Sequence, residues 1–437
     1  DFMRFPQEFI DELKNQADIV RIIGDYVTLK KKGQNYWACC PFHGEKTPSF
    51  SVSGAKGFFK CFGCGKAGTV FQFVMEIEGS NFSEAVKTVA EKAGVALPVL
   101  TNKDDTKYYE ERDKLRDELR QLNVWATEFF ENSLEGGEGR IALEYLAKRG
   151  ISDESRRQFR LGYAPNSWDA LSSYLQKRGA SKFQIERSGL VSLKDSGSGF
   201  YDKFRGRLMF PILDAQGKVI AFGGRILGEG EPKYLNSPET TLFHKGACLY
   251  NHHRARKAAH DAGTIIAVEG YVDVISMSVA GFPHCVAPLG TALTADQCDL
   301  LWRMSEEPIL CFDGDKAGRK AAYRALDTAL PLIAPGKTLR FALLPEGQDP
   351  DDLARSGGAS AISAVLEAAR PFVDLLWMRE TEDAPIDTPE RRAALERRVF
   401  GLIKEISDEG LRRHYSDALR ERFQTLFGRD RAAARPA

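Results

Sequence analysis

Two short segments near the start of the chain carry residue types that bind metal. Cys40 and His43 are separated by two residues, and Cys61 and Cys64 repeat that spacing. Paired Cys-x2-His and Cys-x2-Cys segments suit tetrahedral zinc, and four protein ligands leave no open position for a reactive water. Cys39 is the rival of Cys40, but only Cys40 gives the Cys-x2-His spacing. The sequence therefore predicts one structural zinc ion, against the alternative of reduced thiols and an imidazole in a small core.

Lysines and aromatic residues surround these metal-binding segments. The lysines are Lys30, Lys31, Lys32, Lys46, Lys56, Lys60 and Lys66, and the aromatic residues are Tyr36, Trp37, Phe50, Phe58, Phe59 and Phe62. Cations attract phosphates and exposed rings stack on unpaired bases, so the region is a candidate platform for single-stranded nucleic acid. The alternative is that most rings form the core of the domain. For any single ring we favour the core, and for the lysines together we favour binding.

A second group of reactive side chains follows three apolar segments, residues 264–268, 308–312 and 338–344, each of which predicts a buried strand. In open α/β sheets, active sites lie at the carboxyl ends of parallel strands, so we expect these side chains to meet at one sheet edge. The acids that follow the three segments are Glu269 and Asp273, then Asp313 and Asp315, then Asp349, Asp351 and Asp352.

Clustered carboxylates raise one another's pKa, so such a group cannot be fully ionised without cations. Oxygen ligands suit magnesium and manganese, and two such ions would relieve the repulsion. The alternative is that each acid caps the helix that follows it. That role is reasonable for Asp315 or Asp352 alone, but it does not explain acids after all three strands.

The elements that position these residues indicate a multidomain α/β protein, α+β overall. The 437 residues are 43% apolar and 28% charged, which is enough to bury several cores. The expected parts are an N-terminal zinc ribbon, a mixed α+β basic subdomain, an α/β subdomain with a mostly parallel sheet and a C-terminal helical subdomain. Their expected bounds are residues 3–100, 117–258, 259–365 and 366–432, with residues 101–116 as either a linker or the start of a solvated helix.

Charge and cysteine use limit the cellular setting. The 61 Lys and Arg balance the 61 Asp and Glu, so no whole-chain positive field indicates a nucleic-acid partner, although a local basic face is compatible with neutrality. No stretch approaches the ~18 apolar residues of a membrane span, which predicts no membrane partner. Cys285 and Cys311 lie in apolar segments and are interpreted as small buried hydrophobes. We expect a reducing, cytoplasmic setting.

Several motifs resemble those of bacterial primases, from about residue 4 to about residue 360 and in the family's order. Residues 45–52, between the metal-binding segments, resemble the family's zinc-binding domain, and residues 204–212, 222–225 and 232–240 resemble its basic segment. The segments similar to the family's Toprim motifs are EGYVD at 269–273, PLGTALT at 288–294, DGDKAG at 313–318 and DPD at 349–351.

The resemblance implies a DNA-directed RNA polymerase that makes short RNA primers on single-stranded DNA for replication, by metal-assisted nucleotidyl transfer. It implies catalytic roles for Glu269, Asp313 and Asp315, and metal binding by these three with Asp273, Asp349 and Asp351. Whether Glu269 is a metal ligand or a general base stays open. The family's basic segment contacts template and nucleotides, which implicates Lys203, Arg205, Arg207, Arg225, Lys233, Tyr234, Asn236 and Lys245.

Lys203, Arg205 and Arg207 occupy alternate positions, and alternate residues of a strand project to one side. This alternation is compatible with a solvated strand face or with a continuous cationic ridge. We favour the ridge, because Arg225 and Lys233 follow close by in the sequence.

The resemblance also implies partners: a single-stranded DNA template, ribonucleoside triphosphates and the replicative helicase, with single-strand-binding protein as a further candidate. Because the chain stops at residue 437, soon after the core would finish, we expect the helicase-binding domain to be missing and helicase stimulation to be weak. The competing functions are a topoisomerase, a nuclease and a non-catalytic zinc-ribbon DNA-binding protein. The complete acidic set argues against the last, and no motif supports a nucleophilic tyrosine.

Overall fold

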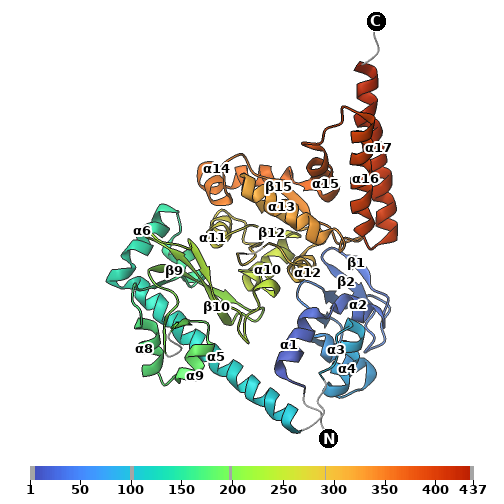
Figure 1. Cartoon of the computed structure of the whole chain (residues 1–437). Coiled ribbons are helices and arrows are strands. Elements are labelled where there is room, and N and C mark those ends of the chain that lie inside the picture. Colours follow the sequence, from blue (N-terminus) through green and yellow to red (C-terminus); the bar gives the residue numbers. More distant parts are fainter. Residues whose placement is uncertain (1–4, 99–102, 196–198, 291, 434–437) are drawn as a thin grey trace. The chain divides into compact units, whose positions relative to one another are not determined.

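The computed structural model describes residues 5–98, 103–195, 199–290 and 292–433. The chain divides into two compact units (Figure 1). The first comprises residues 1–128, 168–203 and 240–242, and the second comprises residues 129–167, 204–239 and 243–437. The expected basic subdomain, residues 117–258, thus contributes to both units.

The first unit begins with a five-stranded antiparallel sheet in the order β1-β2-β3-β4-β5. Alternate residues of its strands, such as Phe50, Val52 and Phe59, are buried in one core with the helices around the sheet. The elements are α1 (Gln7–Gln16), α2 (Ile19–Gly24), β1 (Lys30–Lys32), β2 (Asn35–Ala38), β3 (Phe50–Ser53), β4 (Phe58–Cys61), β5 (Ala67–Gly68), α3 (Val70–Glu78) and α4 (Phe82–Ala93).

A long helix, α5 (Lys103–Glu135), follows and continues into the second unit. Of the two alternatives for residues 101–116, the described part, from Lys103 on, is therefore helix. The first unit is completed by α8 (Ala170–Lys177), α9 (Lys182–Arg187), β7 (Val191–Leu193) and β8 (Phe200–Asp202). The buried Asp202 carboxylate accepts the backbone N–H groups of Leu171 and Ser172 at 2.7 and 3.0 Å, which satisfies the first turn of α8.

The second unit contains a four-stranded antiparallel sheet in the order β11-β10-β9-β6. A Cβ at Gly162 would lie 2.5 Å from the Phe130 Cβ, so glycine allows β6 to approach α5 closely. The elements are α6 (Arg140–Lys148), α7 (Asp153–Gln158), β6 (Gly162–Ala164), β9 (Arg207–Leu213), β10 (Val219–Ile226) and β11 (Tyr234–Asn236).

The rest of the second unit is built on a five-stranded sheet in the order β13-β12-β14-β15-β16. Its first four strands are parallel and β16 is antiparallel, as expected for an α/β unit with a mostly parallel sheet. The elements are α10 (His252–Ala262), β12 (Ile266–Ala267), α11 (Tyr271–Val279), β13 (Cys285–Val286), α12 (Ala295–Met304), β14 (Ile309–Phe312), α13 (Lys316–Ala329), β15 (Arg340–Leu343), α14 (Pro350–Glu367) and β16 (Arg370–Pro371).

Helices close the chain, as expected: α15 (Phe372–Thr381), α16 (Pro389–Leu402) and α17 (Glu409–Ala433). One continuous apolar core joins them to the parallel sheet, since it includes Leu310 of β14 and Phe423 of α17. Among the residues that the structure describes, no helix combines the length and apolarity needed to cross a bilayer.

Phe341 of β15 provides a test of this shared core. Its side chain is 1% exposed and its ring centre lies 6.0 Å from that of Phe372 in α15. Phe341→Ala should lower the free energy of unfolding of this unit by about 3–5 kcal/mol, because it removes a large buried side chain and leaves a cavity. Urea unfolding followed by tryptophan fluorescence measures the loss. Phe341→Leu, which keeps most of the volume, should cost less than half as much, and equal costs would contradict the packing.

Candidate active site and metal centres

Acidic side chains meet at the carboxyl ends of three adjacent parallel strands. Glu269 follows β12, Asp313 follows β14, and Asp349 follows β15 after a short turn. Glu269 Oε1 accepts the backbone N–H of Asp313 at 3.0 Å, which joins two of the strand ends directly. At the third, carboxylate oxygens of Asp349, Asp351 and Asp352 lie within 4.8 Å of one another. The sheet thus gathers the acids as the strand pattern predicted.

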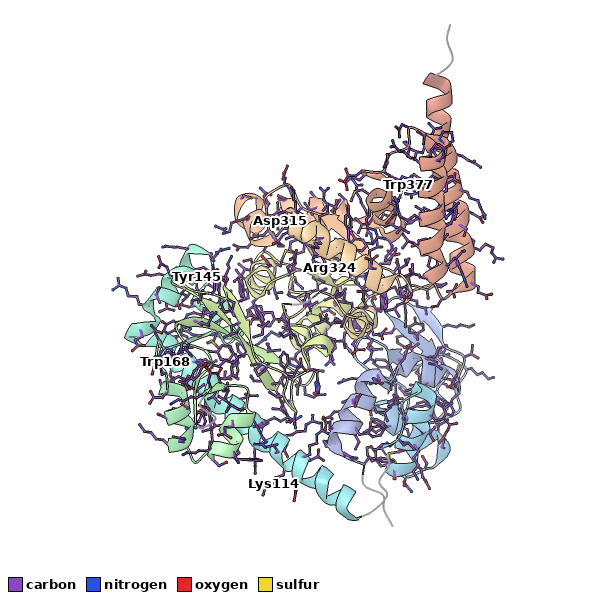
Figure 2. All side chains as sticks on the ribbon, viewed as in Figure 1. Lys114, Tyr145, Trp168, Asp315, Arg324 and Trp377 are labelled. Atoms are coloured by element: carbon purple, nitrogen blue, oxygen red, sulfur yellow. The ribbon has the colours of Figure 1, made fainter. Side chains whose placement is uncertain are left out.

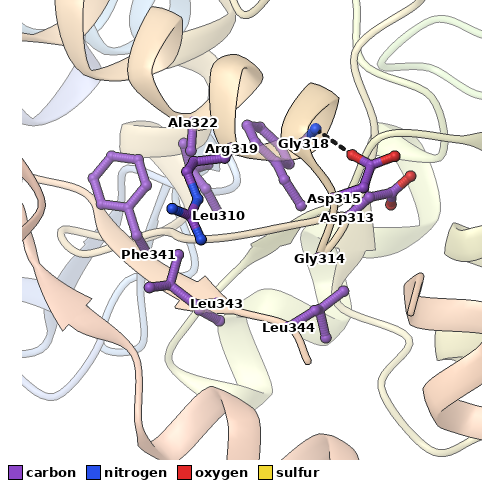
Figure 3. A pocket seen from close by; sticks show the side chains of 12 residues that line it. Leu310, Asp313, Gly314, Asp315, Gly318, Arg319, Ala322, Phe341, Leu343 and Leu344 are labelled. Atoms are coloured by element: carbon purple, nitrogen blue, oxygen red, sulfur yellow. Dashed lines mark hydrogen bonds between the residues drawn. The ribbon is translucent and has the colours of Figure 1, made fainter. Parts of the chain in front are cut away.

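Two of the acids also cap the helices that follow them. Asp315 accepts the Gly318 N–H at 2.7 Å at the start of α13, and Asp349 accepts the Asp352 N–H at 2.7 Å at the start of α14. Figure 3 shows Asp313 and Asp315 side by side on the rim of a small cavity of about 50 Å³. A Cβ at Gly314 would lie 1.9 Å from the Pro345 carbonyl oxygen, so the turn that presents both acids requires glycine. Capping uses one oxygen of each carboxylate and leaves the other for a ligand.

The electrostatics of the cluster show unrelieved repulsion. Burial and the negative charges of Glu269, Asp349 and Asp315 together raise the pKa of Asp313 to about 7. Burial also raises the pKa of Glu269, with Asp315 adding to the effect. Asp313 Oδ1 is buried and has no hydrogen-bond partner among the described residues. An unpaired carboxylate oxygen amid other acids is the donor set that a hard divalent cation prefers, so these residues fit Mg²⁺ or Mn²⁺.

Two further predicted metal ligands, Asp273 and Asp351, are more deeply buried than Asp313. Burial raises the pKa of Asp273 well above its ordinary value, and Asp313, Asp349 and Asp351 add to the shift. Asp351 is fully buried: its Oδ1 accepts the Ser276 hydroxyl at 2.6 Å, and its Oδ2 pairs with Arg149, the C-cap residue of α6, and lies 3.2 Å from Arg355 Nε. These three contacts leave about one lone-pair position of the Asp351 carboxylate, on Oδ1, for a metal.

Cationic and aromatic side chains lie close to the acids within the second unit. The Arg225 guanidinium of β10 stacks over the Tyr145 ring at 4.3 Å and lies 5.9 Å from the Tyr234 ring. Tyr145 is labelled in Figure 2, as is Asp315. Burial raises the pKa of the Tyr145 hydroxyl, and the charges of Arg149, Asp351 and Asp273 also act on that pKa. Neither Tyr145 nor Arg149 was predicted as a functional residue from the sequence. Tyr145 lies in the helix of residues 140–148 and Arg149 directly follows it, and a helical pattern does not distinguish a functional face.

The predicted cationic ridge is wrong in one respect. Lys203 and Arg205 lie in a loop, because β9 begins only at Arg207, and strand alternation does not relate the three. The Arg207 side chain is buried, and its Nη1 donates to the carbonyl oxygens of Gly224 and Pro232 at 3.2 and 2.9 Å. A buried cation satisfied by backbone carbonyls supports the sheet and does not form part of an exposed surface.

The other predicted nucleotide contacts differ in their surroundings. Lys233 and Tyr234 are exposed, and Lys245 is half-buried. Asn236 is already engaged: its Oδ1 accepts the Tyr271 hydroxyl at 2.6 Å and its Nδ2 donates to the Leu289 carbonyl at 3.1 Å. Asn236 thus ties β11 to α11 and to the segment that follows β13.

The second metal centre lies in the zinc ribbon. One ligand atom from each of Cys40, His43, Cys61 and Cys64 falls within 4.8 Å of the others. The Cys40 and Cys64 sulfurs are 3.9 Å apart, and the Cys61 sulfur is 3.8 Å from His43 Nδ1. Ligands about 2.3 Å from a tetrahedral zinc ion are separated by about 3.7 Å. The four side chains therefore fit zinc, with His43 directing Nδ1 to it, and the donor set of three sulfurs and one imidazole is typical of a structural site.

The aromatic residues around the zinc site divide between core and surface. Phe50 and Phe59 are buried, as the core alternative predicted. Phe62, between two zinc ligands, is 62% exposed and stacks on Trp37 at a centroid distance of 5.9 Å. The Lys60 ammonium lies 5.1 Å from the Phe62 ring centre. An exposed ring, stacked on a half-buried ring and lying beside a cation, is compatible with the platform alternative for these residues.

Comparison with known families agrees with both centres. A family model described as CHC2 zinc finger matches residues 5–105, one for the N-terminal domain of the DNA primase catalytic core matches residues 129–256, and one for the Toprim domain matches residues 263–341. The fold and the acidic edge thus define a zinc-ribbon enzyme of the Toprim class.

Similar proteins of known function show to which family within this class the chain belongs. The chain is 41% identical to the DNA primase of Escherichia coli K12 over 94% of its own length and 70% of that protein, and 42% identical to the Pseudomonas aeruginosa DNA primase, over 93% and 61% respectively. The chain belongs to the bacterial DNA primase family, and it is a DNA-directed RNA polymerase that synthesises primers on single-stranded DNA.

Solved structures of primases are also similar to this chain. The Aquifex aeolicus primase with its zinc-binding and RNA polymerase domains is similar to 96% of this chain and 97% of its own at 34% identity and a TM-score of 0.58. A DnaG primase catalytic domain bound to single-stranded DNA is similar to 70% of this chain and 99% of its own at 40% identity and a TM-score of 0.64.

The expectation that helicase-binding sequence is missing is wrong. A family model described as the DnaB-helicase binding domain of primase matches residues 376–426, which span most of α15 to α17. The sequence pattern in this region indicated only amphipathic helices, and such a pattern does not separate a helix that closes a core from one that also binds a partner.

Asp313 allows a direct test of the acidic centre. Asp313→Asn should weaken Mn²⁺ binding more than tenfold. The Asp313 carboxylate carries the oxygen without a partner among the described residues, and the substitution puts a neutral amide of the same shape in its place. Titration followed by electron paramagnetic resonance measures free Mn²⁺. Asp261→Asn, at an exposed position on α10, should bind as the parent protein does, and equal affinities in all three proteins would contradict the assignment.

Proposed function

We propose that the acidic edge is the nucleotidyl-transfer centre of this primase, with Glu269, Asp313 and Asp315 as catalytic residues and Mg²⁺ or Mn²⁺ as the cofactor. The observation that carries this proposal is that acids follow three adjacent parallel strands at one sheet edge, where the buried Asp313 Oδ1 has no partner among the described residues. Asp273, Asp349 and Asp351 would complete the ligand set. When bound, the divalent ions would activate the attacking 3′-hydroxyl and neutralise the departing pyrophosphate.

The substrates are ribonucleoside triphosphates, whose negative charge needs cations on the side away from the metals. Arg225 and Lys233 supply such charge next to Tyr145 and Tyr234, and the exposed Tyr234 ring offers a stacking surface. Preorganised charge and positioning supply most of the catalysis in phosphoryl transfer, so the chain has to contribute little covalent chemistry. Lys203, Arg205 and Lys245 remain candidates for template contacts.

The template also engages the zinc ribbon in this proposal. Residues directly opposite one another in a sheet project from the same face, and the pairings place Lys30, Trp37, Ser51 and Lys60 in one row across four strands. The row has lysines at both ends, and Phe62 stacks on Trp37 next to it. Cations at both ends of the row and a stacked pair of rings suit unpaired bases and their phosphates.

The partners of the proposed function are single-stranded DNA and the replicative helicase, with residues 376–426 as the helicase contact. Single-strand-binding protein as a partner, the bounds of the five expected segments and a cytoplasmic site of action stay predictions.

Glu269→Gln should abolish primer synthesis while leaving DNA binding unchanged, because the amide keeps the shape of the side chain and removes its charge from the metal edge. Incubation with Mg²⁺, a single-stranded template and labelled ribonucleotides measures the products. Labelled RNA made by the parent protein and lost in the variant supports the proposal. A shortened template would indicate a nuclease, and primer synthesis by the variant would refute the role of Glu269.

Phe62→Ala should weaken binding of single-stranded DNA by about 1–3 kcal/mol, the usual contribution of one stacked base. Phe82, 42% exposed on α4 and in contact with Phe71, provides the matched control. Fluorescence anisotropy with a labelled oligonucleotide compares Phe62→Ala with Phe82→Ala. Equal effects of the two substitutions would show that Phe62 is not part of a binding face.

A further inference from the structure

The carboxylate of Glu45 lies next to the zinc ligands and has no role assigned so far. Its Oε2 lies 3.2 Å from His43 Nε2, the ring nitrogen directed away from the other ligands. Its Oε1 accepts the Cys40 N–H at 2.6 Å. One side chain therefore contacts the ring of one ligand and the backbone of another.

Glu45 also reaches a third ligand through Ser49. The Ser49 hydroxyl donates to Glu45 Oε2 at 2.6 Å, and the Ser49 N–H donates to Oε1 at 3.1 Å. The same hydroxyl oxygen lies 3.2 Å from the Cys61 sulfur. Ser49 immediately precedes β3, and the Phe62 N–H donates to its carbonyl at 2.9 Å. The carboxylate thus links the Cys40-to-His43 segment to the strand that supports the second pair of ligands.

We propose that Glu45 is the positioning residue of the zinc site, which fixes the tautomer of His43 and holds the two ligand pairs together. A neutral imidazole that binds zinc through Nδ1 must carry its proton on Nε2, and a carboxylate opposite Nε2 accepts that proton in a hydrogen bond. This hydrogen bond locks the ring orientation and makes Nδ1 a stronger donor. The inference rests on the zinc assignment and is independent of the proposed catalytic roles.

The geometry explains why an acid is needed at this position. Glu45 faces four hydrogen-bond donors: two backbone N–H groups, one hydroxyl and the imidazole N–H. A carboxylate has about four lone-pair sites and no donor of its own, so it satisfies all of them. Glutamine would keep one oxygen for the backbone groups, but its NH₂ would oppose the imidazole N–H and reverse the direction of the hydrogen bond with the Ser49 hydroxyl.

Glu45→Gln should weaken zinc binding about 10–100-fold, the usual effect of removing the carboxylate partner of a metal-bound histidine. Competition with a chromophoric chelator, on the full chain, measures the dissociation constant. Glu91→Gln, at an exposed position of α4, should leave it unchanged. Circular dichroism at saturating zinc should show that both variants fold. A dissociation constant for Glu45→Gln within twofold of the parent value would overturn the proposal.

A second measurement separates positioning from a merely structural role. In the zinc-loaded parent protein, the ¹⁵N spectrum should show His43 protonated at Nε2, with slow exchange of that proton, and exchange should accelerate in Glu45→Gln. Ser49→Ala, which removes one contact, should weaken zinc binding by about fivefold, as expected for one hydrogen bond, and should leave the exchange slow. If Glu45→Gln does not fold, a rapidly exchanging Nε2 proton in the parent protein overturns the proposal by itself.

Discussion

Repulsion between carboxylates is the constraint on which the catalytic half of this protein depends. The pKa values of Glu269, Asp273, Asp313 and Asp349 are all raised, by burial first and by their acidic neighbours second. Side chains under such repulsion stay together only if the backbone that carries them cannot move apart. Parallel pairing of β12, β14 and β15 above a continuous apolar core provides that rigidity. The energy that folding gains in the core thus maintains a site that favours divalent cations.

The two metal centres differ in how far hydrogen-bond donors of the protein satisfy their ligand atoms. At the zinc site three of the four ligands have a supporting contact: the N–H groups of Phe42 and Cys64 point at the sulfurs of Cys40 and Cys61 at 3.4 Å, and a carboxylate faces the imidazole of His43. Such a site is closed, and its metal supports folding. The acidic edge has backbone donors for some oxygens but leaves Asp313 Oδ1 without a partner among the described residues. An incomplete set of contacts suits ions that must also bind a substrate.

The functional residues that a local sequence pattern marks could be predicted. Those whose contacts form only through the fold could not. The zinc ligands follow from spacing and the acids from their places after apolar strands, because both patterns are local. Arg149 reaches Asp351 across 202 positions of sequence, and an arginine near the end of an ordinary amphipathic helix carries no local sign of that contact. The prediction for Arg207 was wrong for a related reason: alternation was extended over residues that precede the strand, and burial of the side chain depends on the neighbouring β10.

The register of the ribbon shows how metal chemistry determines which rings reach solvent. Cys61 must face the metal, and it pairs with Phe50 across the sheet on the buried side. Because successive side chains of a strand alternate between faces, Phe59 is placed in the core and Lys60 on the exposed face. Phe62 continues that alternation beyond the strand end and is exposed. A shift by one residue would bury Lys60 and remove Cys61 from the zinc site. The zinc ligands therefore fix the register that exposes Phe62, so that the zinc site and the proposed nucleic-acid surface depend on the same strand.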